Sequence, residues 1–144
     1  MAAPVRKESN TSIRLWPELR AELDRRASRG ATRTDLINQF AIEGMRMDEF
    51  PGIVFRSGPA GRRPGLFAGP DVWEIARVVR EVKPRGDKAI AATARSIGLR
   101  ADQVQTAVAY YAAYRQEIDA WIEMVDAEAD WLEAAWAQRM DVLA

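Results

Sequence analysis

The sequence contains no cysteine and no histidine. The absence of cysteine excludes disulfides, thiolate nucleophiles and thiolate metal sites. The absence of histidine removes the imidazole that most hydrolases use as a proton carrier and that many zinc sites use as a ligand. Carboxylates such as Asp126 and Asp130 could still bind magnesium, but carboxylates at helical spacing more often form a solvated face. We therefore expect no enzyme activity, no metal site and no cofactor.

Long apolar runs are absent as well. No run reaches the length that spans a membrane, and residues 1–9 are too short and too polar for a secretion signal. The hydrophobic content of 48% and the length of 144 residues are nevertheless sufficient for one ordinary domain or two small ones. We expect a folded cytoplasmic protein without a membrane segment.

The formal net charge of zero conceals an uneven distribution. Residues 1–115 contain 20 of the 21 basic residues and 13 of the 21 acidic residues, which leaves a surplus of +7. Residues 116–144 contain eight acidic residues and Arg139, which leaves −7. Such asymmetry indicates one part that binds nucleic acid and an acidic part that binds something basic, unless the helix faces are unevenly charged by chance.

The N-terminal stretch has the pattern of one strand followed by two helices. Across residues 10–15 polar and apolar side chains alternate, as on a strand with one buried face. Pro17 and Gly30 suit the start and the end of a first helix, and Thr32 with Asp35 resembles a capping box that opens a second. Because a lone strand is not stable in water, we expect it to pair with the same strand of a second chain. The chain should therefore form a homodimer or a higher even oligomer.

The sequences Ser12-Ile-Arg-Leu-Trp-Pro-Glu-Leu19 and Thr32-Arg-Thr-Asp-Leu36, with Gly30 between them, resemble the ribbon-helix-helix fold of Arc- and CopG-type repressors. This resemblance implies an operator-DNA-binding and dimerisation module over residues 1–49. The alternative is a strand and a helical hairpin on the surface of another domain. In the family, side chains of the ribbon read bases in the major groove, and backbone amides at the start of the second helix hold phosphates. By position, the resemblance assigns the reading of bases to Asn10, Ser12 and Arg14, and the binding of phosphates to Thr32, Arg33 and Thr34.

Residues 50–115 predict a short hairpin followed by helices. The hairpin is expected within residues 52–69, and Pro64 restricts its second strand to an edge. Arg62 and Arg63 either contact phosphates or are ordinary loop charges. Further on, Ala94, Gly98 and Val104 have the spacing of a helix-turn-helix, with a small residue at the crossing, a glycine in the turn and an aliphatic anchor. An interior helical hairpin is an equal alternative.

The same region resembles the small helical family filed as domain of unknown function four-three-three. The resemblance spans about residues 50–122 and rests on spaced anchors, namely Phe50-Pro-Gly-Ile53, Gly61-Arg-Arg-Pro64, Gly69-Pro-Asp-Val-Trp-Glu-Ile75, Gly98-Leu99, Val104, Ala107 and Tyr110-Tyr-Ala-Ala-Tyr-Arg-Gln-Glu-Ile118. It implies a prokaryotic antitoxin that is encoded beside a toxin of the PIN or PIN-like ribonuclease class.

Residues 116–144 predict one long acidic amphipathic helix. Its apolar residues recur at steps of four and three, as in a coiled-coil seam. Large aromatics flanked by acids suit insertion into a groove of a partner. The alternative is that the helix folds back on its own domain or on its dimer mate. The predicted partner-binding residues are Trp121, Val125, Leu132 and Trp136, with Glu123, Asp126 and Asp130 facing basic groups of the partner.

Together these patterns predict a mainly α protein with an intermolecular two-stranded ribbon, a helix-turn-helix-like domain with a short hairpin, and a long C-terminal helix. The functional prediction is a type II antitoxin that inhibits a PIN-like ribonuclease toxin and represses its own operon by binding operator DNA. The alternative is a stand-alone dimeric repressor with no toxin partner.

Overall fold

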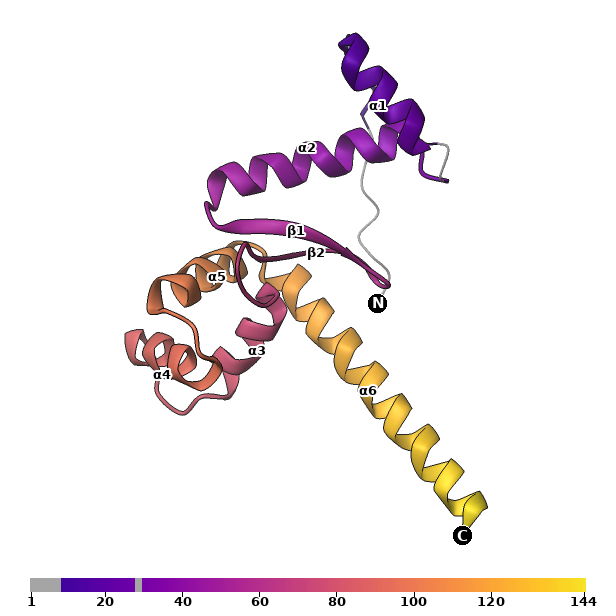
Figure 1. The fold of residues 1–144 in the computed structure, drawn as a ribbon. Coiled ribbons are helices and arrows are strands. Elements are labelled where there is room, and N and C mark those ends of the chain that lie inside the picture. The colour runs from indigo at the N-terminus through magenta and orange to yellow at the C-terminus, as the bar shows by residue number, and fades with distance from the viewer. Residues whose placement is uncertain (1–8, 28–29) are drawn as a thin grey trace. The chain divides into compact units, whose positions relative to one another are not determined.

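The computed structural model describes residues 9–27 and 30–144. Over these residues the chain is mainly helical, with six α-helices and one two-stranded antiparallel sheet (Figure 1). It divides into two compact units, Met1–Ile42 and Glu43–Ala144. No helix within the described part of the chain is long and apolar enough to cross a lipid bilayer. The mainly α class with a small hairpin and a long last helix is therefore confirmed.

The first unit contains α1 (Pro17–Ala27) and the start of α2 (Arg33–Glu49). Pro17 opens α1 as predicted. The N–H of Asp35 donates to Thr32 Oγ1 over 3.1 Å, so Thr32 caps α2. The second half of the predicted capping box differs, because the Asp35 carboxylate accepts the Thr32 hydroxyl at 2.5 Å. In a capping box this side chain would accept the backbone N–H of Thr32, but the aspartate carboxylate accepts the Thr32 hydroxyl instead.

The first unit buries few apolar side chains. Among its described residues, Leu23 and Leu36 are the only buried hydrophobic ones, at 3% and 8% exposure. Trp16 is 79% exposed and Ile13 59%. Residues 9–16 form neither helix nor strand in the single chain. The predicted ribbon needs a second chain and stays a prediction.

The second unit begins with the last turns of α2 and the predicted hairpin. Strands β1 (Ile53–Gly58) and β2 (Gly61–Leu66) pair antiparallel, with Ile53 opposite Leu66 and Phe55 opposite Pro64. In a two-stranded sheet both strands are edges, so the missing N–H of Pro64 is tolerated. The hairpin is confirmed.

Helices α3 (Val72–Glu81), α4 (Asp87–Ile97), α5 (Ala101–Ala113) and α6 (Arg115–Leu143) complete the second unit. The N–H of Asp71 donates to Glu74 Oε1 over 3.1 Å, which caps the start of α3. Gly98 ends α4 in the left-handed conformation, with φ of 70°. Ala94 and Val104 are both buried. The helices and the glycine turn of the predicted helix-turn-helix are thus present.

The core of the second unit joins the hairpin to α3, α4, α5 and the start of α6. Fully buried side chains come from α3, α5 and α6, namely Val72, Ile75, Val104, Tyr110 and Ile118. Ile122 is also buried in this cluster. The first turns of α6 therefore pack within the second unit, although the sequence pattern predicts a separate segment from residue 116.

Polar contacts of Glu43 and Arg46 attach the last turns of α2 to the rest of the second unit. The carboxylate of Glu43, which is buried, accepts from Arg62 Nε at 2.7 Å. Arg46 Nη1 donates to the Tyr110 hydroxyl at 2.9 Å and to Glu117 at 3.0 Å. The Arg46 guanidinium also lies 3.9 Å from the centre of the Tyr114 ring. These contacts satisfy polar groups that would otherwise be unfavourable near the core.

Candidate partner-binding surface

Helix α6 passes from the core into solvent. Ile118 and Ile122 near its start are 0% and 5% exposed, whereas Leu132 and Trp136 are 54% and 60% exposed. Met140 and Leu143 follow at steps of four and three and are also exposed. Such steps keep side chains on one face of a helix, so the buried face of α6 continues into a solvent-exposed apolar face. We call the exposed residues Leu132, Trp136, Met140 and Leu143 the distal stripe.

The composition of α6 explains why this exposed part is helical. The 29-residue helix is rich in alanine and in the charged and aliphatic residues that favour helix. Along its distal half almost every residue is exposed, and Ala135 alone is half-buried after Asp126. Helix propensity therefore sustains a segment that packs little against its own chain (Figure 1).

The acidic residues of α6 divide into two groups. Those near the start form ion pairs with other parts of the second unit: Glu117 with Arg46, Asp119 with Arg80, and Asp126 with Arg77. Within residues 9–27 and 30–144, no ion pair involves the other acidic residues of α6, namely Glu123, Glu128, Asp130, Glu133 and Asp141.

These pairs bear on the predicted partner-binding acids. Glu123 and Asp130 are exposed and unpaired in the described chain, as a surface that faces a partner requires. Asp126 is half-buried and its carboxylate is engaged by Arg77. Asp126 therefore holds α6 to α3, which corresponds to the alternative in which the helix folds back on its own domain.

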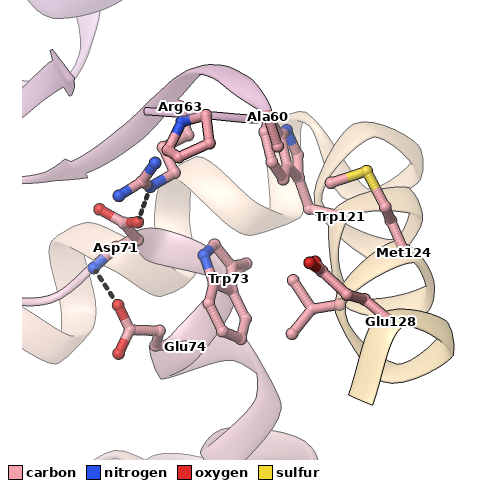
Figure 2. Close-up of a pocket in the computed structure, with 10 residues that line it drawn as sticks. Ala60, Arg63, Asp71, Trp73, Glu74, Trp121, Met124 and Glu128 are labelled. Atoms are coloured by element: carbon pink, nitrogen blue, oxygen red, sulfur yellow. Dashed lines mark hydrogen bonds and ion pairs between the residues drawn. The ribbon is translucent and has the colours of Figure 1, made fainter. Parts of the chain in front are cut away.

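A pocket of about 490 Å³ lies where the proximal part of α6 meets α3 and the hairpin turn (Figure 2). Trp121 and Val125, two of the predicted partner-binding residues, line it from α6. Trp73 lines it from α3, and both indoles are half-buried. The structure thus brings two predicted residues together with an aromatic residue almost fifty positions earlier in the chain.

Several pocket residues were not predicted to bind a partner. Met124 and Glu128 come from α6, and Arg63 and Glu74 come from β2 and α3. Trp73 could have been found from the sequence, because it lies outside the apolar stripe that its helix buries. A tryptophan at such a position is exposed to solvent unless another element covers it. The acids could not have been found in this way, since an exposed carboxylate on a helix is ordinary.

Two charged residues that line the pocket, Asp71 and Arg63, are already in ion pairs. Asp71 is buried and accepts from Arg56 Nη2 at 2.8 Å and from Arg63 Nε. Arg56 also donates to the carbonyl oxygens of Leu66, at 2.8 Å, and Gly69, at 3.1 Å. These contacts fix the hairpin to the start of α3.

The arginine pair of β2 is neither of the two things that the sequence suggested. Arg62 is bound to the buried Glu43, and Arg63 to the buried Asp71. Both side chains are only partly exposed. They are structural ion pairs, so neither a phosphate contact nor a free loop charge describes them.

The predicted DNA-binding residues all lie in the first unit and are all exposed. Asn10, Ser12 and Arg14 lie in the stretch without helix or strand, and Thr32, Arg33 and Thr34 lie at the start of α2. The guanidinium of Arg33 pairs with Asp24 of α1. The Arg33 side chain is therefore occupied, and only its backbone amide, to which the family resemblance assigns the phosphate contact, is available for DNA.

The helix-turn-helix has few free donors on its second helix. Arg100 makes two contacts with Asp102, at 3.0 and 3.1 Å, and lowers the pKa of that carboxyl. The Thr106 hydroxyl donates to the Asp102 carbonyl, and the Gln103 amide donates to the Ala68 carbonyl. Since α5 also contributes four buried residues to the core, the interior-hairpin alternative is favoured for α4 and α5.

The described residues contain no group of three acidic side chains arranged to hold a metal ion. The pocket and the distal stripe share one face of α6, because Trp121, Val125, Glu128, Leu132 and Trp136 follow at steps of four, three, four and four. Comparison with protein-family models, curated proteins and solved structures finds no match for the chain.

Proposed function

We propose that the chain is the antitoxin of a type II toxin-antitoxin pair, which captures a protein toxin through α6 and binds its own operator through the first unit. The observation that carries the proposal is the distal stripe. Leu132 and Trp136 continue a buried helix face into solvent, where four apolar residues lie exposed at helical spacing. A contiguous exposed apolar face of this kind is typical of a protein-protein interaction site.

The resemblance of residues 50–122 to an antitoxin family names the class of partner, a PIN-like ribonuclease. A nuclease surface that binds RNA is basic, and α6 carries the exposed acids Glu123, Asp130 and Glu133 beside its apolar residues. Inhibition would occur by occlusion: α6 covers the surface that RNA would occupy. This chain contributes no catalytic group.

The DNA-binding half of the proposal is supported by the small core of the first unit. With two buried hydrophobic residues among those described, the unit has apolar side chains left over, including Ile13 and Trp16. A unit of about 40 residues usually needs a partner or a cross-link to be stable. A second copy would supply both the missing core and the second strand of the ribbon, which would place Asn10, Ser12 and Arg14 in the major groove.

The second candidate is a stand-alone repressor in which α6 pairs with α6 of a second chain. The observation in its favour is the regular spacing of the apolar residues, which also fits a coiled-coil seam. In that case the distal stripe holds the dimer together and binds no toxin.

A double substitution separates the two candidates. Leu132→Ala with Trp136→Ala removes the exposed apolar groups without disturbing the core, and Gln138→Ala serves as the control on the same helix. With the product of the adjacent reading frame co-expressed, we expect the double variant to lose capture of that protein. It should remain a DNA-binding dimer by size-exclusion chromatography with light scattering. A monomer would overturn the proposal in favour of the stand-alone repressor, and capture at the parent level would overturn the role of the stripe.

A further inference from the structure

The pocket beside α6 combines aromatic walls with negative charge. Trp73 from α3 and Trp121 from α6 present their indoles to it, and Glu74 and Glu128 also line it. Figure 2 shows the Glu128 carboxylate directed toward the indoles and the Glu74 carboxylate turned back to the backbone nitrogen of Asp71. An indole face attracts a cation more strongly than any other side-chain ring does. The lining is thus suited to a positively charged group that is flat enough to stack.

The charges of the pocket are not balanced within the chain. Asp71 is matched by two arginines. Glu74 uses one carboxylate oxygen to accept the N–H of Asp71 and is otherwise exposed. Glu128 is exposed, and no ion pair or hydrogen bond of the described residues involves its carboxylate. The Glu128 carboxylate therefore faces the pocket, Glu74 adds a second negative charge at its edge, and neither is paired with a cation among the described residues.

The pocket is also continuous with the surface that we assign to the toxin. From Glu128 the same face of α6 reaches Leu132 after one turn and Trp136 after the next. A protein that lies along the distal stripe would therefore have the pocket within reach of its side chains. A free metabolite would gain nothing from this continuity.

We propose that the pocket binds an arginine side chain of the protein that covers α6, with the guanidinium stacked on the indoles and hydrogen-bonded to Glu128. This inference rests on the proposed function and adds to it one anchoring contact. Arginine fits better than lysine, because its planar guanidinium stacks on an aromatic face and donates two parallel hydrogen bonds to one carboxylate. The ammonium of lysine is compact and strongly hydrated.

The test uses the indole N–H signals of the full-length protein in a ¹⁵N-¹H correlation spectrum. The chain has five tryptophans, and single Trp→Phe substitutions assign their signals. Titration with N-acetyl-argininamide should shift the signals of Trp73 and Trp121 and leave those of Trp16, Trp131 and Trp136 in place. N-acetyl-citrullinamide has nearly the same shape but no charge, and should shift none of them. N-acetyl-lysinamide should bind more weakly than the arginine compound.

A matched pair of variants tests the role assigned to the acid. Glu128→Gln should weaken the arginine titration about ten-fold, because the negative charge and one of the two acceptor oxygens of the carboxylate are lost. Glu133→Gln removes the same charge from an exposed position of the same helix that does not line the pocket, and should leave the titration unchanged. Equal shifts with citrullinamide, equal shifts of Trp131 and Trp136, or equal effects of the two variants would each overturn the inference.

Failure here and failure of the proposed function give different results. If the pocket does not bind arginine but the Leu132 and Trp136 variant still loses the toxin, only the arginine inference is lost. If the pocket binds arginine while no adjacent protein is captured, the proposed partner is lost. When both hold, Glu128→Gln should also weaken capture of the toxin, and Glu133→Gln should weaken it less.

Discussion

At the scale of single residues, one buried hydroxyl in the described part of α4 lacks a hydrogen-bond partner. Thr93 is fully buried, and its Oγ1 has no hydrogen-bond partner among the residues that the structure describes. A buried polar atom without a partner is destabilising by about 1–3 kcal/mol. Valine has nearly the same shape and no hydroxyl. Thr93→Val should therefore raise the free energy of unfolding by about 1 kcal/mol in urea denaturation.

The control for this substitution is Thr106→Val. The Thr106 hydroxyl donates to the Asp102 carbonyl at 3.1 Å, so its removal loses a hydrogen bond and should not stabilise the protein. A Thr93→Val protein that is less stable than the parent would show that this hydroxyl has a partner in solution.

Tyr110 links stability to alkaline pH. Burial raises the pKa of its phenol to about 12, although Arg46 donates a hydrogen bond to its oxygen. The unfolded chain ionises a tyrosine near pH 10, so the folded state holds this proton more tightly. The resulting stabilisation is complete below about pH 10 and is lost as the pH rises from about 10 to 12. We expect a decline of about 2 kcal/mol over that range.

Urea denaturation at successive pH values measures this decline. Tyr110→Phe has no proton to lose, so its stability should fall less over the same range than that of the parent. Tyr111 adds a smaller contribution of the same sign, since burial and Asp119 also raise its pKa. An identical pH dependence in parent and Tyr110→Phe would contradict the assignment to Tyr110.

At the scale of elements, the turn between α4 and α5 depends on one glycine. Gly98 has φ of 70°, and a side chain added there would meet no atom within 4 Å. Gly98→Ala therefore tests backbone conformation without a steric clash, and should cost about 1–2 kcal/mol in unfolding free energy. Gly44→Ala is the matched control, because Gly44 lies inside α2 with equally free space.

The two substitutions should change the free energy of unfolding in opposite directions. In a helix interior alanine is more favourable than glycine by about 0.5–1 kcal/mol, so Gly44→Ala should stabilise the protein. Thermal unfolding followed by circular dichroism measures both. Equal melting temperatures for Gly98→Ala and the parent would show that the turn does not need the left-handed conformation.

The elements that the sequence predicted well are those that local chemistry determines. Thr32 caps α2, Pro64 fits an edge strand, and Gly98 separates two helices, because each effect acts within a few residues. The predicted strand over residues 10–15 stays a prediction, because the strand with which it would form hydrogen bonds belongs to a second chain.

What the sequence could not predict are contacts between distant residues. The pocket joins Trp73 to Trp121, and the ion pair of Arg77 with Asp126 spans 49 positions. No local rule fixes which acid of α6 meets which arginine. The apolar seam of α6 was visible as a period of four and three, but the point at which it leaves the core, after Ile122, depends on how much of α6 the other helices cover.

At the scale of the whole molecule, some of the charges behind the asymmetry pair with each other inside the second unit, and others remain exposed. Part of the acidic surplus of α6 is matched by Arg46, Arg77 and Arg80 within the second unit. The +7 of residues 1–115 is thus not all available to nucleic acid. The first unit, with its exposed Arg14, becomes the main candidate for DNA contact, and the unpaired acids of α6 remain for a basic partner.

The DNA-binding assignment predicts a specific effect of Arg14→Ala. A guanidinium that makes two hydrogen bonds to one guanine contributes about 1–3 kcal/mol of discrimination, so the variant should lose affinity for the operator by that amount and relax preference at one base pair. Affinity of the parent should also fall steeply with salt concentration, because Lys and Arg that neutralise phosphates release counterions. Fluorescence anisotropy with DNA from upstream of the reading frame measures both.

Arg33→Ala is the control for this prediction, because the Arg33 side chain pairs with Asp24 and the family resemblance assigns only its backbone amide to DNA. It should weaken binding less than Arg14→Ala and should leave the base preference unchanged. Both variants should remain dimers, since Arg14 and Arg33 are exposed. If Arg14→Ala binds the operator as tightly as the parent while the dimer is intact, the ribbon does not read bases through this residue, and DNA contact must be sought on another face of the first unit.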